Sequence, residues 1–548
     1  MPTFTDLAPE LILLTANELP TSSLAALSIT SRQLRPLIEP LLYGSIQWRF
    51  LQDFKAVSFA QDSDEADDND RRFMAFVHTI LKRPDLASHV ARLRLELEAD
   101  YCRNAYKLEI PVQDQLALSH LIKEMSLPNE EIMLEGLKGG SLDVVTAVLV
   151  SRLHNLKILE VEHSLVRFFN LFGDMLSFLG AGPSLSLAHL TKPSLVKVRF
   201  YNWNLDEIKN VRLKGTLKPI YSLFEMPSLE SISINLPEPI DDWKLKTSLG
   251  NSRIVLNNLR TLRLLNSQAS VDTLGYILAV TPRLEVLEYN FVQDLDDLWY
   301  DRNYECGHHD EWGLLSTVLR KVSSTLECLT VSVSFHYLED YKEPDVEQDW
   351  VGEVWKRRGK MGPLRAFTKL WRLEIPTAVL LGYQRDTNPG QLFASLPPNI
   401  EELCLRDDLI NMWFEYGYQW SPWESNVRGS ELNSSFSETC DPSPILAQLE
   451  RCLAQCSNTA SGNEALSCLN TLILKQSRNR LWPDPFRTQL KLLVNRAGIV
   501  GKIQIRQGDA YDQVDIAKVI ELDLEDDPDA ETARFFDERS KSLSRVYL

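Results

Sequence analysis

The residue types best suited to chemistry stand together in one stretch of the sequence. Cys306, His308, His309 and Asp310 fall within five consecutive positions. Thiolate, imidazole and carboxylate groups are the ligands that zinc takes in proteins, and a closed zinc site needs four of them in tetrahedral geometry. A second ligand pair at matching spacing is absent from the sequence. We therefore expect no metal here, while an enzyme that uses Cys306, His308 and His309 stays open as an alternative.

A second pair of ligand-type residues, Cys452 and Cys456, lies four positions apart on an expected helix. Residues at this spacing share one helix face. Two further ligands are missing, so the expected role of this pair is packing. The chain has 8 cysteines, and their scattered positions form no disulfide framework. This usage is typical of a reducing compartment and predicts a cytoplasmic and/or nuclear protein.

The motifs of the common enzyme classes are missing from the sequence. It has no nucleophile elbow, metalloprotease helix, dinucleotide glycine fingerprint or set of kinase motifs. The pair Gly139 and Gly140 precedes Ser141 without the Lys-Ser/Thr pair that a phosphate-binding loop requires. We therefore expect no catalytic residue and no cofactor, and we predict a protein that is not itself an enzyme.

The charge balance narrows the class of partner. The chain carries 58 basic and 76 acidic residues, a formal net charge of -18. General nucleic-acid binding needs a basic face, and docking on an anionic membrane needs the same. No run reaches the ~18 apolar residues that a membrane-spanning helix requires, and the first residues do not have the pattern of a signal peptide. We expect neither nucleic acid nor membrane as a partner, although a local basic patch stays open.

The elements that must position any functional residue are short apolar strands with one repeated spacing. In residues 259–289 a strand pattern is followed by a helical pattern that Ser270 can cap and that Pro282 ends, and the strand pattern then returns. The apolar-x-x-apolar-x-apolar spacing occurs at Val90/Leu93/Leu95, Leu156/Leu159/Val161, Leu195/Val198/Phe200, Leu229/Ile232/Ile234, Leu259/Leu262/Leu264, Leu284/Leu287/Tyr289, Leu326/Leu329/Val331, Leu370/Leu373/Ile375, Ile400/Leu403/Leu405 and Leu469/Leu472/Leu474, with a weaker copy at Val500/Ile503/Ile505.

One strand and one helix per repeat predict an α/β fold of the solenoid type. We expect an irregular leucine-rich-repeat array over residues 85–510, with parallel strands on the concave face and helices on the convex face. The spacing between copies is uneven, and three long insertions interrupt the array at 292–311, 338–361 and 407–440. Residues 511–548 follow as a C-terminal tail.

The strand residues between the pattern positions are expected to point outward, because alternate side chains of a strand face opposite sides. A long concave face suits a protein or peptide partner better than a small molecule. The alternative is that these residues are merely solvated. The outward positions are Arg94, Glu160, Arg199, Ser233, Arg263, Glu288, Thr330, Glu374 and Cys404.

The insertion at 407–440 is rich in tryptophan and tyrosine. These residues dominate binding hot spots, but they also build small cores, and both interpretations stay open. Together with four positions of the strand face they form the predicted target-binding set, which is Arg199, Arg263, Glu288, Glu374, Trp413, Tyr416 and Trp420.

Residues 5–46 differ from the repeats and predict three short helices. Pro9 suits the first turn of a helix that ends near Asn17. Thr21, Ser22 or Ser23 can cap a second helix, and Thr30 or Ser31 a third. Three short helices cannot bury all the leucines of this segment among themselves. Either the segment caps the solenoid, or its spare apolar surface docks a partner.

The N-terminal segment resembles the F-box. The matching residues are Leu7-Ala8-Pro9-Glu10-Leu11, then Leu19, Leu24, Leu27-Ser28, Ser31, Leu34 and Leu42-Tyr43, with Ala8 standing where the family's Leu-Pro pair is continuous. The phrases AVTPRLEVLEY, SSTLECLTVS, FTKLWRLEIP and LPPNIEELCLRDDL are similar to fungal F-box proteins with leucine-rich repeats.

The resemblance implies a substrate-recognition subunit of a Skp–cullin–F-box ubiquitin ligase. Its F-box, residues 1–48, would dock a Skp-type adaptor and through it a cullin, and the repeat face would bind a target protein. Residues 49–84 would form a linker with an acidic loop and a helix. The alternative is an interaction scaffold outside any ligase. The adaptor-binding residues that the resemblance implies are Leu7, Pro9, Leu11, Leu24, Leu27 and Leu34.

Overall fold

The computed structural model divides the chain into two compact units. Unit 1 holds Met1–Asn235 and Trp243–Leu262, and unit 2 holds Leu236–Asp242 and Arg263–Leu548. The residues that the structure describes are 7–51, 64–98, 107–125, 129–166, 169–180, 195–201, 218–224, 226, 228–236, 255–294, 311–336, 359–382, 391–407, 443–457, 468–477, 484–506 and 519–523.

Unit 1 begins with three helices and continues as a parallel sheet. Its helices are α1 (Pro9–Asn17), α2 (Thr21–Thr30), α3 (Arg35–Gly44), α4 (Asp64–Lys82), α5 (Pro84–Ala87), α6 (Val112–Met125), α7 (Glu130–Lys138), α8 (Leu142–Arg152), α9 (His163–Val166), α10 (Asn170–Gly180) and α12 (Lys218–Leu223). Its strands are β1 (Ser45–Leu51), β2 (Arg92–Glu98), β3 (Ile158–Glu162), β4 (Lys197–Tyr201) and β5 (Ser231–Ile234).

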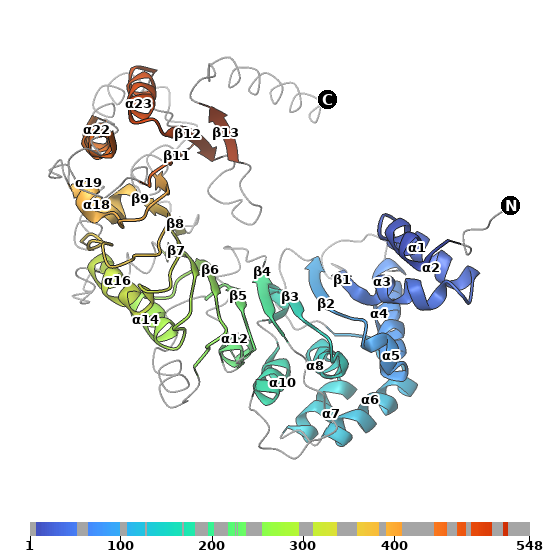
Figure 1. Ribbon diagram of the computed structural model, residues 1–548. Coiled ribbons are helices and arrows are strands. Elements are labelled where there is room, and N and C mark those ends of the chain that lie inside the picture. The colour runs from blue at the N-terminus through green and yellow to red at the C-terminus, as the bar shows by residue number, and fades with distance from the viewer. Residues whose placement is uncertain are drawn as a thin grey trace, which may run out of the picture. The chain divides into compact units, whose positions relative to one another are not determined.

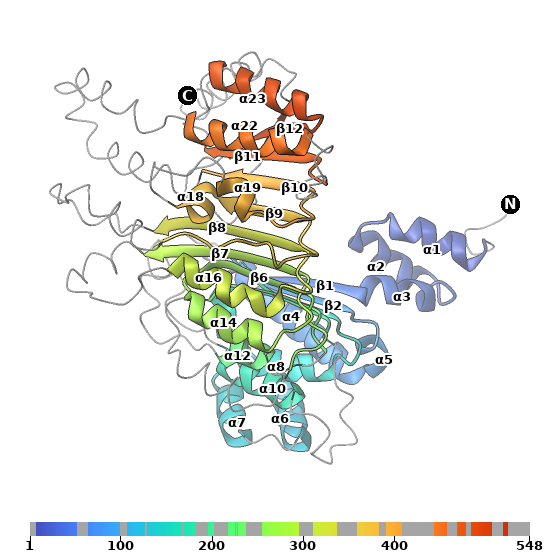
Figure 2. The same cartoon turned by 60° about the vertical axis from the view of Figure 1, so that its left-hand side comes forward.

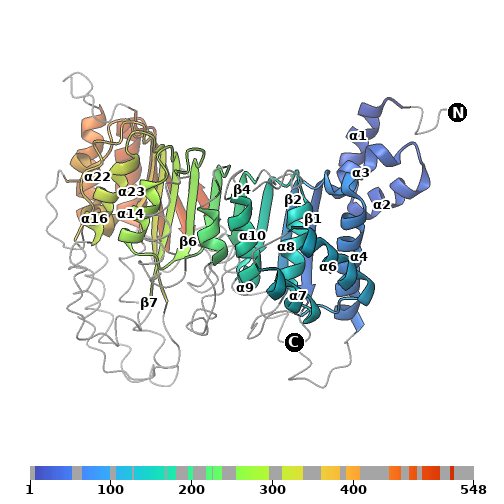
Figure 3. The ribbon, with the colours of Figure 1, turned by 90° about the horizontal axis from the view of Figure 1, so that it is seen from below.

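The five strands of unit 1 pair in chain order, and every neighbouring pair is parallel. Parallel neighbours need a crossover connection, and the intervening helices supply it. The helices α4, α8, α10 and α12 lie on one side of the strands (Figure 1), and the view from below shows the same for α4, α8 and α10 (Figure 3). The opposite side of the sheet, called the open face below, therefore carries the side chains that point away from these helices.

Unit 2 repeats the same arrangement in chain order from β6 to β13, and the turned view shows its strands from β6 to β12 (Figure 2). Its strands are β6 (Thr261–Ser267, which belongs to this unit from Arg263 onward), β7 (Val286–Asp294), β8 (Cys328–His336), β9 (Arg372–Pro376), β10 (Glu402–Arg406), β11 (Thr471–Ser477), β12 (Val500–Arg506) and β13 (Val519–Asp523). Its helices are α14 (Val271–Ala279), α16 (Glu311–Leu319), α18 (Thr377–Leu381), α19 (Gln391–Ser395), α22 (Ser443–Ser457) and α23 (Asp484–Ala497). The last strand, β13, runs antiparallel to β12.

The strands predicted from the leucine spacing are confirmed. Each of the eleven triplets coincides with a strand from β2 to β12, and every residue of the ten clear copies is at most 5% exposed. The weaker copy departs from this rule, because Val500 is 51% exposed. The spacing therefore marks the side chains that pack beneath the helices, and the α/β class with a parallel sheet follows from it. The sheet is open.

One strand was not predicted. The expected linker begins at residue 49, but β1 pairs with β2 over seven residues, from Ser45 beside Arg92 to Leu51 beside Glu98. The side chains of Trp48 and Phe50 pack against Phe73 of α4. The ring centroid of Phe73 lies 5.3 Å from that of Trp48 and 4.9 Å from that of Phe50. The sheet therefore starts directly after the N-terminal helices.

Local signals place the helices well. Ser270 caps α14 as predicted, since its Oγ accepts a hydrogen bond from the Thr273 backbone N–H at 3.2 Å. In the N-terminal segment α1 ends at Asn17, as expected, but α2 begins at Thr21 behind Pro20 and has no side-chain cap. The third helix begins only at Arg35, because a turn separates it from Ser31.

Asp143 of α8 fastens the next helix of the array. Its two carboxylate oxygens accept hydrogen bonds from the backbone N–H groups of Leu171 (2.8 Å) and Phe172 (2.7 Å), in the first turn of α10. Burial raises the pKa of Asp143 to about 6, the two hydrogen bonds oppose that rise, and the charge of Asp174 adds to it. The folded protein therefore holds a proton at a pH where the unfolded chain has released it.

The substitution Asp143→Asn is expected to remove this pH dependence. Because the folded pKa of Asp143 is raised, the wild type loses stability as the pH rises from about 4 to about 6. Relative to the wild type, the variant should gain about 3 kcal/mol in unfolding free energy across this interval, a shift of about two pKa units at 1.36 kcal/mol each. Urea unfolding at several pH values measures the difference. A difference that does not change with pH would contradict the assignment.

Candidate interaction surfaces

The three N-terminal helices leave apolar surface exposed. Their core consists of Ile12, Ala16, Leu24, Leu34 and Ile38, with Leu19, Leu27, Leu37, Leu41 and Leu42 packed partly against it. On α1, Leu11 and Leu14 are 50% and 64% exposed. They lie three positions apart, so they share one side of the helix, whereas Ile12 and Ala16 face the core. This exposed side of α1 is called the α1 surface below.

The six predicted adaptor-binding residues divide between this surface and the core. Leu7, Pro9 and Leu11 are exposed, Leu27 is partly buried, and Leu24 and Leu34 are buried in the core of the three helices. Leu24 and Leu34 therefore stabilise the module and cannot reach a partner without its unfolding. Leu14 and Ile29 of α2 are also exposed, at 64% and 86%, and the six predicted residues do not include them. Only the packing of the three helices distinguishes these positions.

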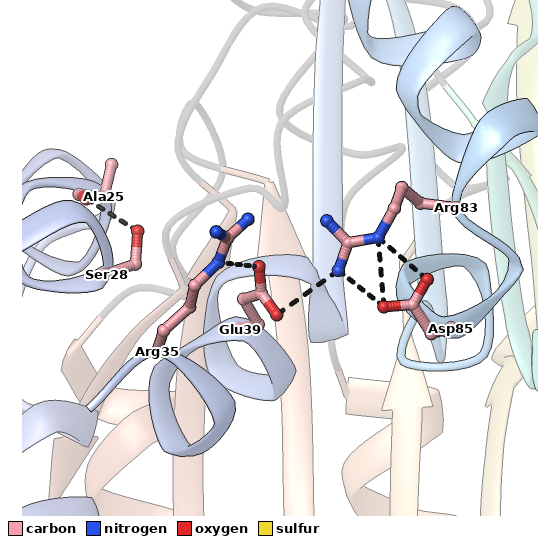
Figure 4. Close-up of polar contacts among 6 residues, drawn as sticks. All are labelled: Ala25, Ser28, Arg35, Glu39, Arg83 and Asp85. Carbon is pink, nitrogen blue, oxygen red and sulfur yellow. Dashed lines mark hydrogen bonds and ion pairs between the residues drawn. The ribbon is translucent and has the colours of Figure 1, made fainter. Parts of the chain in front are cut away.

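The helical module is tied to the sheet by charges as well as by the chain. Glu39 of α3 accepts a hydrogen bond from Arg35 Nε at 2.7 Å and lies 3.6 Å from Arg83 Nη2 (Figure 4). Arg83 also binds Asp85 of α5, and that hydrogen bond lowers the pKa of Asp85 to about 2. Arg83 is thus shared between the module and the segment that leads into β2.

The open face of unit 1 is lined by charged side chains. Glu96 of β2 lies 2.5 Å from Arg94 Nη2 and 3.4 Å from Arg49 Nε, and it accepts a hydrogen bond from Gln47 at 3.1 Å. Across the next strand pair, Arg92 donates to one oxygen of Glu160 with Nη2 at 2.6 Å and Nε at 3.1 Å.

Several residues predicted to be outward lie on the open face but are buried. Glu160 and Ser233 in unit 1 and Glu374 and Cys404 in unit 2 are each at most 5% exposed. Alternation along a strand fixes the face of a side chain and not its exposure. Arginine and lysine side chains of other strands bind Glu160 and Glu374. Arg199 and Arg263 are exposed as predicted, and Arg263 forms an ion pair with Glu288 at 3.4 Å.

Glu374 is the centre of an ion cluster in unit 2. Lys475 Nζ of β11 lies 2.7 Å from Glu374 Oε1, and Arg406 of β10 binds the same oxygen. Burial would raise the pKa of Glu374, but the charges and hydrogen bonds of Arg406 and Lys475 outweigh it and hold the pKa below its ordinary value. The carboxylate is therefore ionised at neutral pH. The predicted target-binding residue Glu374 is thus already bound by two side chains of its own chain.

Cys328 of β8 and Cys404 of β10, on the corresponding face of unit 2, are poor nucleophiles. Burial raises the pKa of the Cys404 thiol to about 12, and burial also raises the pKa of Cys328. The thiolate is the reactive form of cysteine, and both groups hold their protons at neutral pH. Neither residue is therefore a candidate for covalent chemistry.

Several predictions concern residues outside those that the structure describes. These are the aromatic residues Trp413, Tyr416 and Trp420 and the cluster Cys306, His308, His309 and Asp310. Cys452 is buried on α22. Among the described residues, no group of three or more histidine, cysteine or acidic side chains has a geometry suited to a metal ion. The described helices also include none with the length and apolar character needed to cross a membrane.

Comparison with known proteins adds no relative to this description. A scan of protein-family models finds no match to the chain, and a search of curated proteins finds none either.

Proposed function

We propose that the chain is the substrate-recognition subunit of a Skp–cullin–F-box ubiquitin ligase. The observation that carries this proposal is the α1 surface, where a three-helix module holds leucines that its own core does not use. Burying a leucine stabilises a complex by about 1.5–3 kcal/mol, so such residues are expected at a docking site. The order of residues from Leu7 to Tyr43 resembles the F-box, and this resemblance implies a Skp-type adaptor as the partner.

In this proposal, the three-helix module and the open face of unit 1 bind different partners. The module docks a Skp-type adaptor, and the open face with its polar side chains binds a target protein. Catalysis is then by proximity, because the ligase brings lysines of the target close to a carrier enzyme that is loaded with ubiquitin. The chain supplies no reacting group in this scheme, and it is a cytoplasmic and/or nuclear protein.

Capture of the adaptor tests the proposal. The double variant Leu11→Asp/Leu14→Asp is expected to weaken binding of a co-expressed Skp-type adaptor at least ~100-fold, since each buried anchor contributes about 2 kcal/mol or more. Both leucines are exposed, so the fold of the module should survive. Affinity capture followed by titration of the purified adaptor gives the change.

Leu116→Asp is the matched control. Leu116 lies on α6 and is 69% exposed, so it has the same residue type and a similar exposure away from α1. This variant should capture the adaptor like the wild type. If the wild type does not bind the adaptor, or if the double variant binds as well as Leu116→Asp does, the ligase proposal fails and an interaction scaffold outside any ligase becomes the better account.

A further inference from the structure

Among the side chains that the structure describes, the open face of unit 1 presents cations outward and buries its carboxylates. The cationic side chains come from β1, β2 and β4, and we call them the cationic surface: Arg49, Arg92, Arg94, Lys197 and Arg199. The side chains of Arg49, Arg92 and Arg94 are 60%, 43% and 35% exposed, and Lys197 and Arg199 are exposed as well.

The acidic side chains described on the same face are Glu96, Glu160 and Glu162, and each is at most 7% exposed. Glu160 contacts the guanidinium of Arg92 at 2.6 Å, and Glu96 contacts those of Arg94 and Arg49. A molecule that approaches this face therefore meets positive charge first. This is unusual in a chain whose net charge is -18, where an even distribution would make the face negative.

The cations are distributed along the sheet and not gathered at one point. Arg94 lies in register with Glu160 on β3, and Glu160 lies in register with Arg199 on β4. Arg92 and Lys197 form a second row through Ile158. Cations on β2 and β4 are thus about 10 Å apart, and alternate residues of one strand about 7 Å.

This spacing distinguishes between anionic ligands. A phosphate group is bound by several donors that converge on one point, often in bidentate geometry. An extended peptide with an acidic residue at every second position presents carboxylates about 7 Å apart, which matches the separation along a strand. Each guanidinium has five N–H donors, so an arginine that already binds a buried glutamate can still donate to a ligand.

We propose that the open face of unit 1 binds an extended, carboxylate-rich segment of the target protein. This inference rests on the proposed function only in calling the bound protein a target, because binding at this surface does not depend on the adaptor. It names the substrate class as proteins with an exposed acidic segment.

Fluorescence anisotropy with labelled decapeptides tests this inference on the full chain. The probe alternates glutamate and serine, and the reference peptide alternates glutamine and serine. We expect the glutamate peptide to bind and to dissociate as salt is added, because exposed charges are screened. The reference peptide should bind the wild type at least about tenfold more weakly than the glutamate peptide does. The glutamate peptide should likewise bind the variant Arg94→Gln/Arg199→Gln at least about tenfold more weakly than it binds the wild type. A tenfold loss of affinity is equivalent to about 1.4 kcal/mol. Equal binding of the two peptides would overturn the inference.

Matched controls separate the cationic surface from general charge effects. Arg283→Gln/Arg372→Gln removes two exposed arginines of unit 2 that lie outside the predicted target-binding set, and it should leave peptide binding unchanged. A phosphoserine peptide that binds more than about tenfold tighter than the glutamate peptide, or displacement of the peptide by an equimolar oligonucleotide, would assign the surface to another ligand and overturn the inference. Adaptor capture by the same variants should be unchanged. A wild type that binds the peptide but not the adaptor would refute the ligase proposal and leave this inference standing.

Discussion

Replacing Phe73 with alanine is expected to destabilise unit 1 by about 4 kcal/mol. Phe73 of α4 is fully buried, and its ring packs against Trp48 and Phe50 of β1. The truncation removes both aromatic contacts and leaves a cavity between α4 and the first strand. Urea unfolding followed by circular dichroism measures the loss.

Phe76→Ala is the control for this prediction. Phe76 lies on the same helix and stacks on Trp48 with ring centroids 6.2 Å apart, but it is partly exposed. Its truncation should cost about 1 kcal/mol, since less apolar area is lost. Because β1 joins the helical module to the sheet, Phe73→Ala should also accelerate tryptic cleavage after Arg49. Equal losses for the two variants would show that the ring of Phe73 has no special role.

Replacing Glu374 with glutamine is expected to destabilise unit 2 by about 3–4 kcal/mol at neutral pH. The substitution leaves Arg406 and Lys475 side by side without the carboxylate that they share. The matched control is Glu402→Gln, because Glu402 pairs with one arginine at 2.9 Å and is more exposed. Its loss should stay below about 1 kcal/mol. Thermal and urea unfolding of both variants give the comparison.

The effect of Glu374→Gln should depend on pH in one direction. A carboxylate whose folded pKa is lowered stabilises the protein above its unfolded pKa, and this contribution disappears as the pH falls through the folded value. The difference between wild type and variant is therefore expected to be complete at neutral pH and to shrink below the ordinary glutamate pKa of 4.5. A difference that grows on acidification would mean that Glu374 is protonated in the folded state.

The sequence predicted the strands because the signal is local. In a leucine triplet the spacing alone indicates which side chains face the helices, and it therefore predicts the burial of Leu262 and Leu373. The same spacing also occurs at Tyr43, Ile46 and Trp48, where it would have found β1. Two of these residues are aromatic, and the pattern follows a helix without a break. The sequence therefore favours the end of the helical segment at this point and does not predict a strand.

The surfaces could not be predicted to the same degree, because they depend on distant partners. The buried carboxylate of Glu374 accepts a hydrogen bond from Lys475, which lies 101 positions away in the sequence. Likewise, the sequence indicates the positions of Leu14 on α1 and Leu24 on α2, but only the packing of these two helices against α3 decides which leucine faces solvent. Exposure is a property of the assembled fold, and a strand or helix pattern does not contain it.

The three-helix module has no linker to the sheet, because α3 ends at Gly44 and β1 begins at Ser45. Flexible tethers let a bound cargo sample many orientations, and a direct helix-to-strand junction removes that freedom. In a ligase, a target held on the sheet would then meet the ubiquitin carrier from one fixed angle. The choice among its lysines would be made by geometry, so two targets with the same acidic segment but differently placed lysines would differ in their modification.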